Sequence, residues 1–160
     1  KFYANQSLNE IRYMIGSGNI NFSDDFEKMV NEIAQTFETN FGIKTNVYTA
    51  SKKIENLNKK AKTHLIRILQ EALSNISRHS NASQVEIKII DGIDDFSFII
   101  CDNGQGFDVK EVEQKNKTDS VKHFGLGNIK KRVNIIGGSV EFINKGGLTI
   151  AIKIKDSVYR

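Results

Sequence analysis

The sequence contains no proline and only one cysteine, Cys101, among its 160 residues. A single cysteine excludes a disulfide framework and a cysteine-rich zinc site, and it is typical of a protein from a reducing compartment. Because proline is absent, glycine, asparagine and aspartate must form the turns. No apolar run approaches the roughly 18 residues of a membrane-spanning helix, and no signal-peptide pattern begins the chain. We therefore expect a cytoplasmic domain, and the sequence leaves open whether its parent protein is anchored in a membrane.

The overall composition is that of an ordinary folded domain. Hydrophobic residues make up 39% of the chain and charged residues 26%, and a chain of this length can bury a sizeable core. The formal net charge of +4 permits a polyanionic partner, either a nucleic acid or the phosphates of a nucleotide. The basic residues are spread among 19 acidic ones, however, and no basic run alternates with aromatic residues. The charge pattern therefore does not favour nucleic-acid binding.

Hydrophobic periodicity predicts both helices and strands. Apolar residues at three- and four-residue spacing predict helices over residues 24–41, 59–78 and 127–136, and residues 1–15 are interpreted as the end of a helix that begins upstream. Asp24 is the expected N-cap of the first complete helix, with Glu27 completing a capping box and Gly42 ending the helix. Strands are predicted over residues 43–49, 85–90, 96–101, 140–143 and 149–155. Helices mixed with consecutive strand pairs indicate a two-layer α/β sandwich.

The long central helix carries a polar stripe that its hydrophobic pattern does not explain. Glu71, Asn75, Arg78 and His79 recur at helical spacing and are expected to share roughly one side of that helix. Magnesium prefers oxygen ligands and keeps several waters, so an amide oxygen together with nucleotide phosphates is a plausible set of ligands. The arginine could neutralise phosphate charge. A solvated helix face with one hydrogen-bonded pair explains the stripe equally simply.

A second polar segment ends a buried strand abruptly. Asp102 and Asn103 are followed by Gly104 and Gly106, and glycines two residues apart let a backbone approach a flat ligand closely. An aspartate at the end of a hydrophobic strand is costly unless it meets a donor, such as the exocyclic amine of adenine. Asparagine followed by glycine is also a strong hairpin signal. The segment is therefore either a turn or a ligand-binding loop.

A third segment places glycines before an amphipathic helix. Gly125 and Gly127 flank Leu126 and precede Asn128, and free N–H groups at such a helix start favour an anion. The glycines do not follow a strand, which excludes the dinucleotide-binding fingerprint, and the sequence has no P-loop motif. A nucleophile elbow, a zinc-protease helix and a C-x-x-C pair are absent as well.

Taken in order, these segments resemble the ATP-binding boxes of the GHKL superfamily, which includes gyrase, heat-shock chaperone ATPases, mismatch-repair ATPases and histidine kinases. Residues 69–80 (LQEALSNISRHS) resemble the N box, 102–107 (DNGQGF) the first glycine box and 124–132 (FGLGNIKKR) the second. Gly146 and Gly147 resemble the third glycine box. The resemblance covers roughly residues 22–155 and is nearest to sensor histidine kinases of the nitrate-sensor-like subgroup. It implies a Bergerat sandwich, a mixed sheet with helices on one face.

The resemblance also implies roles for individual residues, with ATP and Mg²⁺ as cofactors. Asn75 would ligate Mg²⁺, Glu71 would orient a metal-bound water or assist proton transfer, and Asp102 would accept a hydrogen bond from the adenine amine. A mobile lid would span about residues 110–124. The remaining ATP-binding residues implied by the boxes line the phosphates or shape the pocket: Arg78, His79, Gly104, Gly106, Phe107, Gly125, Leu126, Gly127 and Asn128.

Two departures from the family pattern bear on function. Leu148 stands where the family often has a threonine near adenine, which would weaken nucleotide binding. No histidine of the chain is followed by an acidic residue, as the phosphoacceptor of these kinases is. We therefore interpret residues 1–18 as the end of the dimerisation helix with its linker, and 19–160 as the ATP-binding catalytic domain.

The resemblance implies transfer of the γ-phosphoryl group to a histidine on a dimerisation domain outside this chain, and signalling to a response regulator. The parent kinase would be a homodimer, and this domain would contact neither nucleic acid nor membrane. The chain alone is not expected to phosphorylate itself. Two alternatives stay open: a nucleotide-sensing or interaction module that has lost catalysis, and a GHKL ATPase that hydrolyses ATP.

Overall fold

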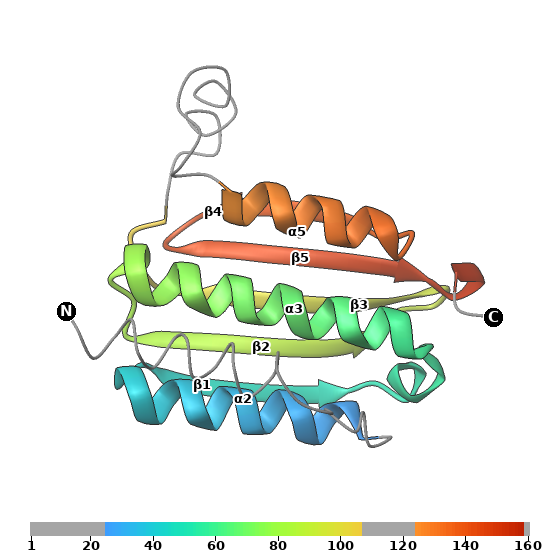
Figure 1. The fold of residues 1–160 in the computed structure, drawn as a ribbon, viewed down its shortest axis with the longest axis horizontal. Coiled ribbons are helices and arrows are strands. Elements are labelled where there is room, and N and C mark those ends of the chain that lie inside the picture. The colour runs from blue at the N-terminus through green and yellow to red at the C-terminus, as the bar shows by residue number, and fades with distance from the viewer. Residues whose placement is uncertain (1–24, 107–123, 159–160) are drawn as a thin grey trace.

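The computed structural model describes residues 25–106 and 124–158, and it builds them into one sheet with helices on one face (Figure 1). The segment interpreted as a dimerisation helix, the position of Phe107 and nearly all of the expected lid lie outside the described residues. The elements in chain order are α2 (Phe26–Phe41), β1 (Lys44–Ala50), η1 (Lys53–Asn56), α3 (Lys59–Asn75), η2 (Ile76–Ser80), β2 (Gln84–Asp91), β3 (Asp95–Asp102), α5 (Phe124–Ile135), β4 (Ser139–Asn144), β5 (Leu148–Lys155) and η3 (Asp156–Val158).

The five strands form a mixed sheet in the order β1-β2-β3-β5-β4. β1 and β2 are parallel, whereas β2 with β3, β3 with β5 and β5 with β4 are antiparallel. α2, α3 and α5 lie side by side across one face of this sheet, as Figure 1 shows. The two-layer α/β sandwich and the mixed sheet covered on one face by helices are therefore confirmed.

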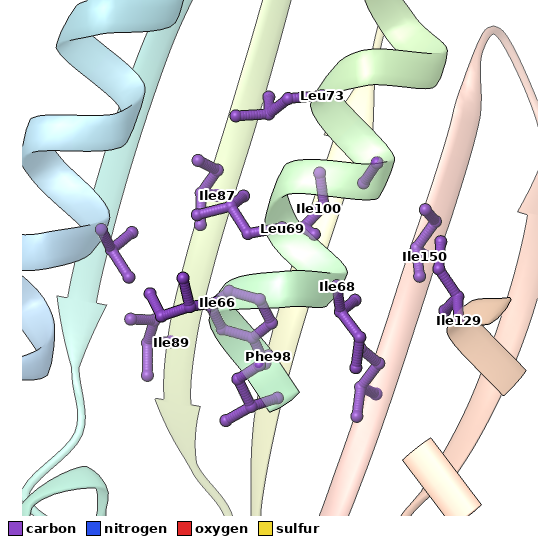
Figure 2. Close-up of a cluster of buried hydrophobic side chains, with 14 of the residues drawn as sticks. Ile66, Ile68, Leu69, Leu73, Ile87, Ile89, Phe98, Ile100, Ile129 and Ile150 are labelled. Atoms are coloured by element: carbon purple, nitrogen blue, oxygen red, sulfur yellow. The ribbon is translucent and has the colours of Figure 1, made fainter. Parts of the chain in front are cut away.

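The core lies between the helices and the covered face of the sheet. Figure 2 shows apolar side chains of α3 pointing toward the strands, with Leu69 and Leu73 near Ile87 of β2. β2 and β3 bury every second residue along most of their length, because successive side chains of a strand point to opposite faces. The apolar residues of α3 recur at three- and four-residue spacing, so they form the stripe that packs on the sheet. No helix among residues 25–106 and 124–158 is long and apolar enough to cross a bilayer.

Three element ends differ from the sequence-based expectation. The N-cap of α2 is Asp25, whose carboxylate accepts a hydrogen bond from the Lys28 N–H at 2.9 Å, so the expected cap at Asp24 is wrong by one residue and Glu27 has no capping-box position. Two consecutive aspartates offer the same chemistry, and the backbone path selects between them. α3 is α-helical only to Asn75 and continues as a π-helical turn, a change that apolar spacing does not reveal. α5 begins at Phe124, three residues before the expected start.

Candidate functional site

The topology gathers the three polar segments at one end of the sandwich. β3 ends at Asp102 next to the start of β5, because Cys101 pairs with Thr149 across the two strands. α3 runs toward this end and α5 begins there, so the two neighbouring helices are antiparallel (Figure 1). Asp102 and Leu148, which are 46 positions apart in the sequence, and Asn75 and Gly125, which are 50 positions apart, therefore meet at this end.

Glu71 and Asn75 meet the first turn of α5 at Gly125. A Cβ atom added to Gly125 would lie 2.5 Å from Asn75 Nδ2 and 2.9 Å from both Asn75 Oδ1 and Glu71 Oε1. Only a glycine allows the helix to approach these two half-buried side chains so closely. The structure thus brings a carboxylate, an amide and the start of a helix together in one place.

Asp102 is a buried carboxylate held by backbone donors. It is only 3% exposed, and its Oδ1 accepts a hydrogen bond from the Gly104 N–H at 2.8 Å. Burial raises the pKa of Asp102, while the backbone N–H groups of Gly104 and Leu148 act in the opposite direction by stabilising the charged form. The backbone thus supplies some of the hydrogen-bond donors that a buried aspartate requires. The Asp102 carboxylate can still accept a further hydrogen bond from a ligand.

The loop after Asp102 is pressed against the end of the N-box segment. A Cβ at Gly104 would collide with the backbone oxygen of Ser80, so this position requires glycine for close approach. The Gln105 N–H donates to the same Ser80 oxygen at 2.8 Å. Residues 103–106 form no strand, so the chain directly after Asp102 runs as an irregular segment beside Ser80.

The other expected site residues are placed less uniformly. Arg78 and His79 are exposed and belong to the π-helical turn η2, so the α-helical spacing that predicted a shared face with Glu71 and Asn75 does not continue through them. Leu126 is buried, Asn128 is half-buried, and a Cβ on Gly127 would meet no atom within 4 Å. Gly106, at a φ of +64°, lies next to the side chain of Asn144.

Sequence reasoning missed two contributors to the site. The backbone N–H of Leu148 supports the Asp102 carboxylate, although the residue drew notice only for its side chain. The side chain of Asn103 bonds to the chain around Ser83, which the reading of Asn103 as a turn residue did not suggest. The glycine pair before Leu148 was the one sequence signal that could have pointed to the Leu148 N–H. No local signal in the sequence pointed to the hydrogen bonds of Asn103.

The oxygen donors near Gly125 fit a magnesium ion. Asn75 Oδ1 and the Glu71 carboxylate are hard ligands, and magnesium commonly takes one or two protein ligands and completes its shell with water and phosphate oxygens. Within residues 25–106 and 124–158, no group of three or more His, Cys, Asp or Glu side chains is arranged to hold a metal ion. The donor set therefore suits an ion that arrives with a phosphate ligand better than a permanently bound structural metal.

Comparison with known proteins places the chain in a family of ATPases. Residues 60–158 match the model of the family described as histidine kinase-, DNA gyrase B-, and HSP90-like ATPase. The chain is 38% identical over 91 residues to the signal transduction histidine-protein kinase/phosphatase DegS of Bacillus subtilis (strain 168), which covers 57% of this chain and 23% of DegS. It is 34% identical over 103 residues to the sensor histidine kinase LiaS of the same organism, and the match covers 64% of this chain and 27% of LiaS. The chain spans about a quarter of the length of these two relatives.

Solved structures share the fold at low sequence identity. The blue-light activated histidine kinase EL346 of Erythrobacter litoralis superposes with a TM-score of 0.66 over 98% of this chain and 53% of its own, at 16% identity. The catalytic domain of histidine kinase ThkA superposes with a TM-score of 0.58 over 96% of this chain and 94% of its own, at 14% identity. These likenesses show an α/β fold of the Bergerat type. Because the matched range holds the carboxylate, amide and glycine segments of the site and more than half of the chain, the chain belongs to the histidine kinase-, DNA gyrase B- and HSP90-like ATPase family.

Proposed function

We propose that this chain is the ATP-binding catalytic domain of a two-component sensor histidine kinase, in a nitrate-sensor-like subgroup. The observation that carries the proposal is the meeting of Asp102, Asn75 and Gly125 at one end of the sandwich. Family membership implies nucleotide binding, and the curated relatives DegS and LiaS are histidine kinases.

Different residues of the site bind different parts of the nucleotide. The Asp102 carboxylate, fixed by two backbone N–H groups, accepts a hydrogen bond from the exocyclic amine of adenine. Asn75 and Glu71 would hold a magnesium ion that arrives with the phosphates, and that ion would supply positive charge against them. The N–H groups of the first turn of α5 would face the phosphate oxygens.

The phosphoryl group leaves this domain for a partner. A nitrogen of the acceptor imidazole attacks the γ-phosphorus, the bond to the β–γ bridging oxygen breaks, and ADP leaves with that oxygen. Positioning and charge neutralisation are the main tasks of the protein in such a transfer. We infer that the acceptor histidine lies on the dimerisation domain of the same kinase, and that a response regulator takes the phosphoryl group next.

The proposal is tested by phosphotransfer in trans. The chain is mixed with the dimerisation domain of its parent kinase and with γ-labelled ATP and magnesium, and the label on each protein is followed. We expect label on the acceptor histidine only when both proteins are present, and none on this chain alone. Asn75→Ala, which removes a metal-binding oxygen, should abolish the transfer.

Two other outcomes would replace the proposal. Multiple-turnover release of phosphate without any acceptor would make the chain a hydrolytic ATPase. Tight binding of ADP without transfer to any acceptor histidine would make it a nucleotide-sensing module.

A further inference from the structure

The side chain of Asn103 ties the loop that follows β3 to the segment that precedes β2. Its Oδ1 accepts hydrogen bonds from the N–H groups of Ser83 and Gln84, both at 2.9 Å. Its Nδ2 donates to Ser83 Oγ at 3.0 Å. One exposed side chain therefore makes three hydrogen bonds to residues about 20 positions earlier in the sequence. These three hydrogen bonds hold the backbone at residue 103 close to the backbone at residues 83 and 84.

Gln105 adds a second fastening to the same neighbour. Its backbone N–H donates to the Ser80 oxygen at 2.8 Å, and its Nε2 donates to the His79 oxygen at 2.9 Å. Both acceptors belong to η2, the π-helical turn that directly follows Asn75. π-helical turns occur frequently at functional sites, where they re-aim the residues around them. Gln105 thus connects the loop after Asp102 to the turn that follows the helix of Asn75, and Asn103 connects the same loop to the start of β2.

The position of Gly104 shows what these bonds accomplish. Gly104 lies between Asn103 and Gln105, and its N–H donates to Asp102 Oδ1 at 2.8 Å. Its Cα is so close to the Ser80 oxygen that no Cβ fits between them. Because both neighbours of Gly104 are anchored to residues 79–84, this glycine cannot move away from Asp102 without breaking their hydrogen bonds.

We propose that Asn103 is a positioning residue for base recognition: it holds Gly104 so that the Gly104 N–H orients the Asp102 carboxylate toward the exocyclic amine of a purine, with Gln105 in a supporting role. The inference rests on the proposed function for its ligand, an adenine nucleotide. Asn103 itself does not touch the base in this arrangement. Asn103 acts through its neighbour Gly104, whose N–H donates a hydrogen bond to the Asp102 carboxylate.

Four variants separate positioning from simple stability. Asn103→Ala removes all three side-chain bonds, and Asn103→Asp keeps the oxygen that accepts from the Ser83 and Gln84 N–H groups. Gln105→Ala removes only the bond to the His79 oxygen. Ser51→Ala is the matched control, because Ser51 makes side-chain hydrogen bonds to Asp91 and to the Ile54 N–H at the opposite end of β2.

The first measurement is the ratio of the affinities for ADP and for inosine diphosphate, which carries a carbonyl in place of the adenine amine. We expect Asn103→Ala to reduce this ratio about tenfold, because a misdirected carboxylate loses the amine but gains nothing from the carbonyl. Gln105→Ala should reduce it by a smaller factor, whereas Asn103→Asp and Ser51→Ala should keep the wild-type ratio. A general loss of stability would weaken both nucleotides equally and leave the ratio unchanged.

The second measurement needs no nucleotide and follows the titration of the Asp102 carboxyl carbon by NMR. If Asn103→Ala frees the Gly104 N–H, the carboxylate loses a donor that stabilises its charge, and the pKa of Asp102 rises above that of the wild type. Ser51→Ala should leave this titration in place, whereas Asn103→Asp puts a second carboxylate beside Asp102 and therefore serves only in the comparison of the two affinities. An unchanged Asp102 titration in Asn103→Ala would overturn the positioning role, whatever the nucleotides do. A wild type that binds ADP and inosine diphosphate equally would instead contradict the proposed role of Asp102, and the titration would still decide the role of Asn103.

Discussion

Gly125 lies so close to Asn75 that a Cβ atom on the glycine would be 2.5 Å from the amide nitrogen of the asparagine. The first turn of α5 therefore rests directly on a side chain that the proposed function assigns to magnesium. The same glycine sits within a helix, where its conformational freedom costs stability relative to alanine. The absence of a side chain at Gly125 is what lets this turn of α5 approach the Asn75 side chain.

Gly125→Ala should separate binding from stability. The added methyl group would displace the Asn75 side chain, and loss of that contact at about 1–3 kcal/mol predicts a loss of roughly 10- to 100-fold in affinity for ADP with magnesium. The free energy of unfolding should fall by less than the full overpacking cost of about 1–3 kcal/mol, because alanine favours a helix by about 0.5–1 kcal/mol over glycine. Gly127→Ala is the matched control, since its Cβ would meet no atom within 4 Å. Calorimetric titration that gave the two variants equal affinities would refute the steric argument.

Asp102→Asn should weaken ADP binding. The amide offers a donor where the adenine amine needs an acceptor, at a cost of about 1–3 kcal/mol, or roughly 10- to 100-fold in affinity. The substitution keeps an oxygen that can accept from the Gly104 N–H, so the fold should persist. Titration calorimetry measures the change directly, and an affinity equal to that of the wild type would speak against Asp102 as the base acceptor.

The Asp102 carboxylate should also change how the free energy of unfolding depends on pH. Burial raises the pKa of Asp102 in the folded protein, so the native state binds this proton more tightly than the unfolded chain does. The resulting stabilisation is fully present below the ordinary carboxyl pKa of 3.8 and is lost as the pH rises through the raised value. Urea denaturation of Asp102→Asn over this range should lack that decline. A variant whose curve ran parallel to the wild type would show that the native and unfolded pKa values are equal.

His64 should respond to pH in the opposite sense. Burial lowers the pKa of His64, and the positive charges of Arg132 and Lys60 lower it further. The unfolded chain therefore takes up this proton first, and stability is lost as the pH falls through 6.5 toward the lowered value. Arg132→Gln, on the neighbouring helix α5, should raise the pKa of His64, which NMR titration of the imidazole can follow. If the titration of His64 did not move, charge from α5 would have no part in the shift.

Leu148→Thr should strengthen nucleotide binding while costing stability. Leu148 is 5% exposed, and the pleat places its side chain on the same covered face of the sheet as Asp102. Thr149 cannot supply the missing hydroxyl, because its Oγ1 bonds to Cys101 Sγ at 3.1 Å. One added hydrogen bond of about 0.5–1.5 kcal/mol predicts a gain of roughly 2- to 12-fold in ADP affinity. Titration that showed equal or weaker binding would remove Leu148 from the base-binding end of the site.

Most of the fold could be predicted from local patterns. The apolar spacing in residues 59–75 and the alternation in residues 85–90 and 96–101 indicate a helix and two strands, and these elements are present within a few residues. The patterns could not place the N-cap of α2 at Asp25, nor the change to a π-helical turn after Asn75. Each of these depends on the path of the backbone, which the spacing of apolar side chains does not specify.

The chemistry of the site is a property of the sequence, because a carboxylate, an amide and glycines at these positions allow only a few kinds of ligand. Their arrangement is a property of the tertiary structure. The contact of Gly125 with Asn75 and the support of Asp102 by the Leu148 N–H join residues about 50 positions apart. Such contacts form only when the sheet sets β3 beside β5 and the core sets α5 beside α3. Local sequence thus determined which groups the protein offers to a ligand, and long-range packing decided where each one lies, because burial of the apolar faces fixes the elements relative to one another.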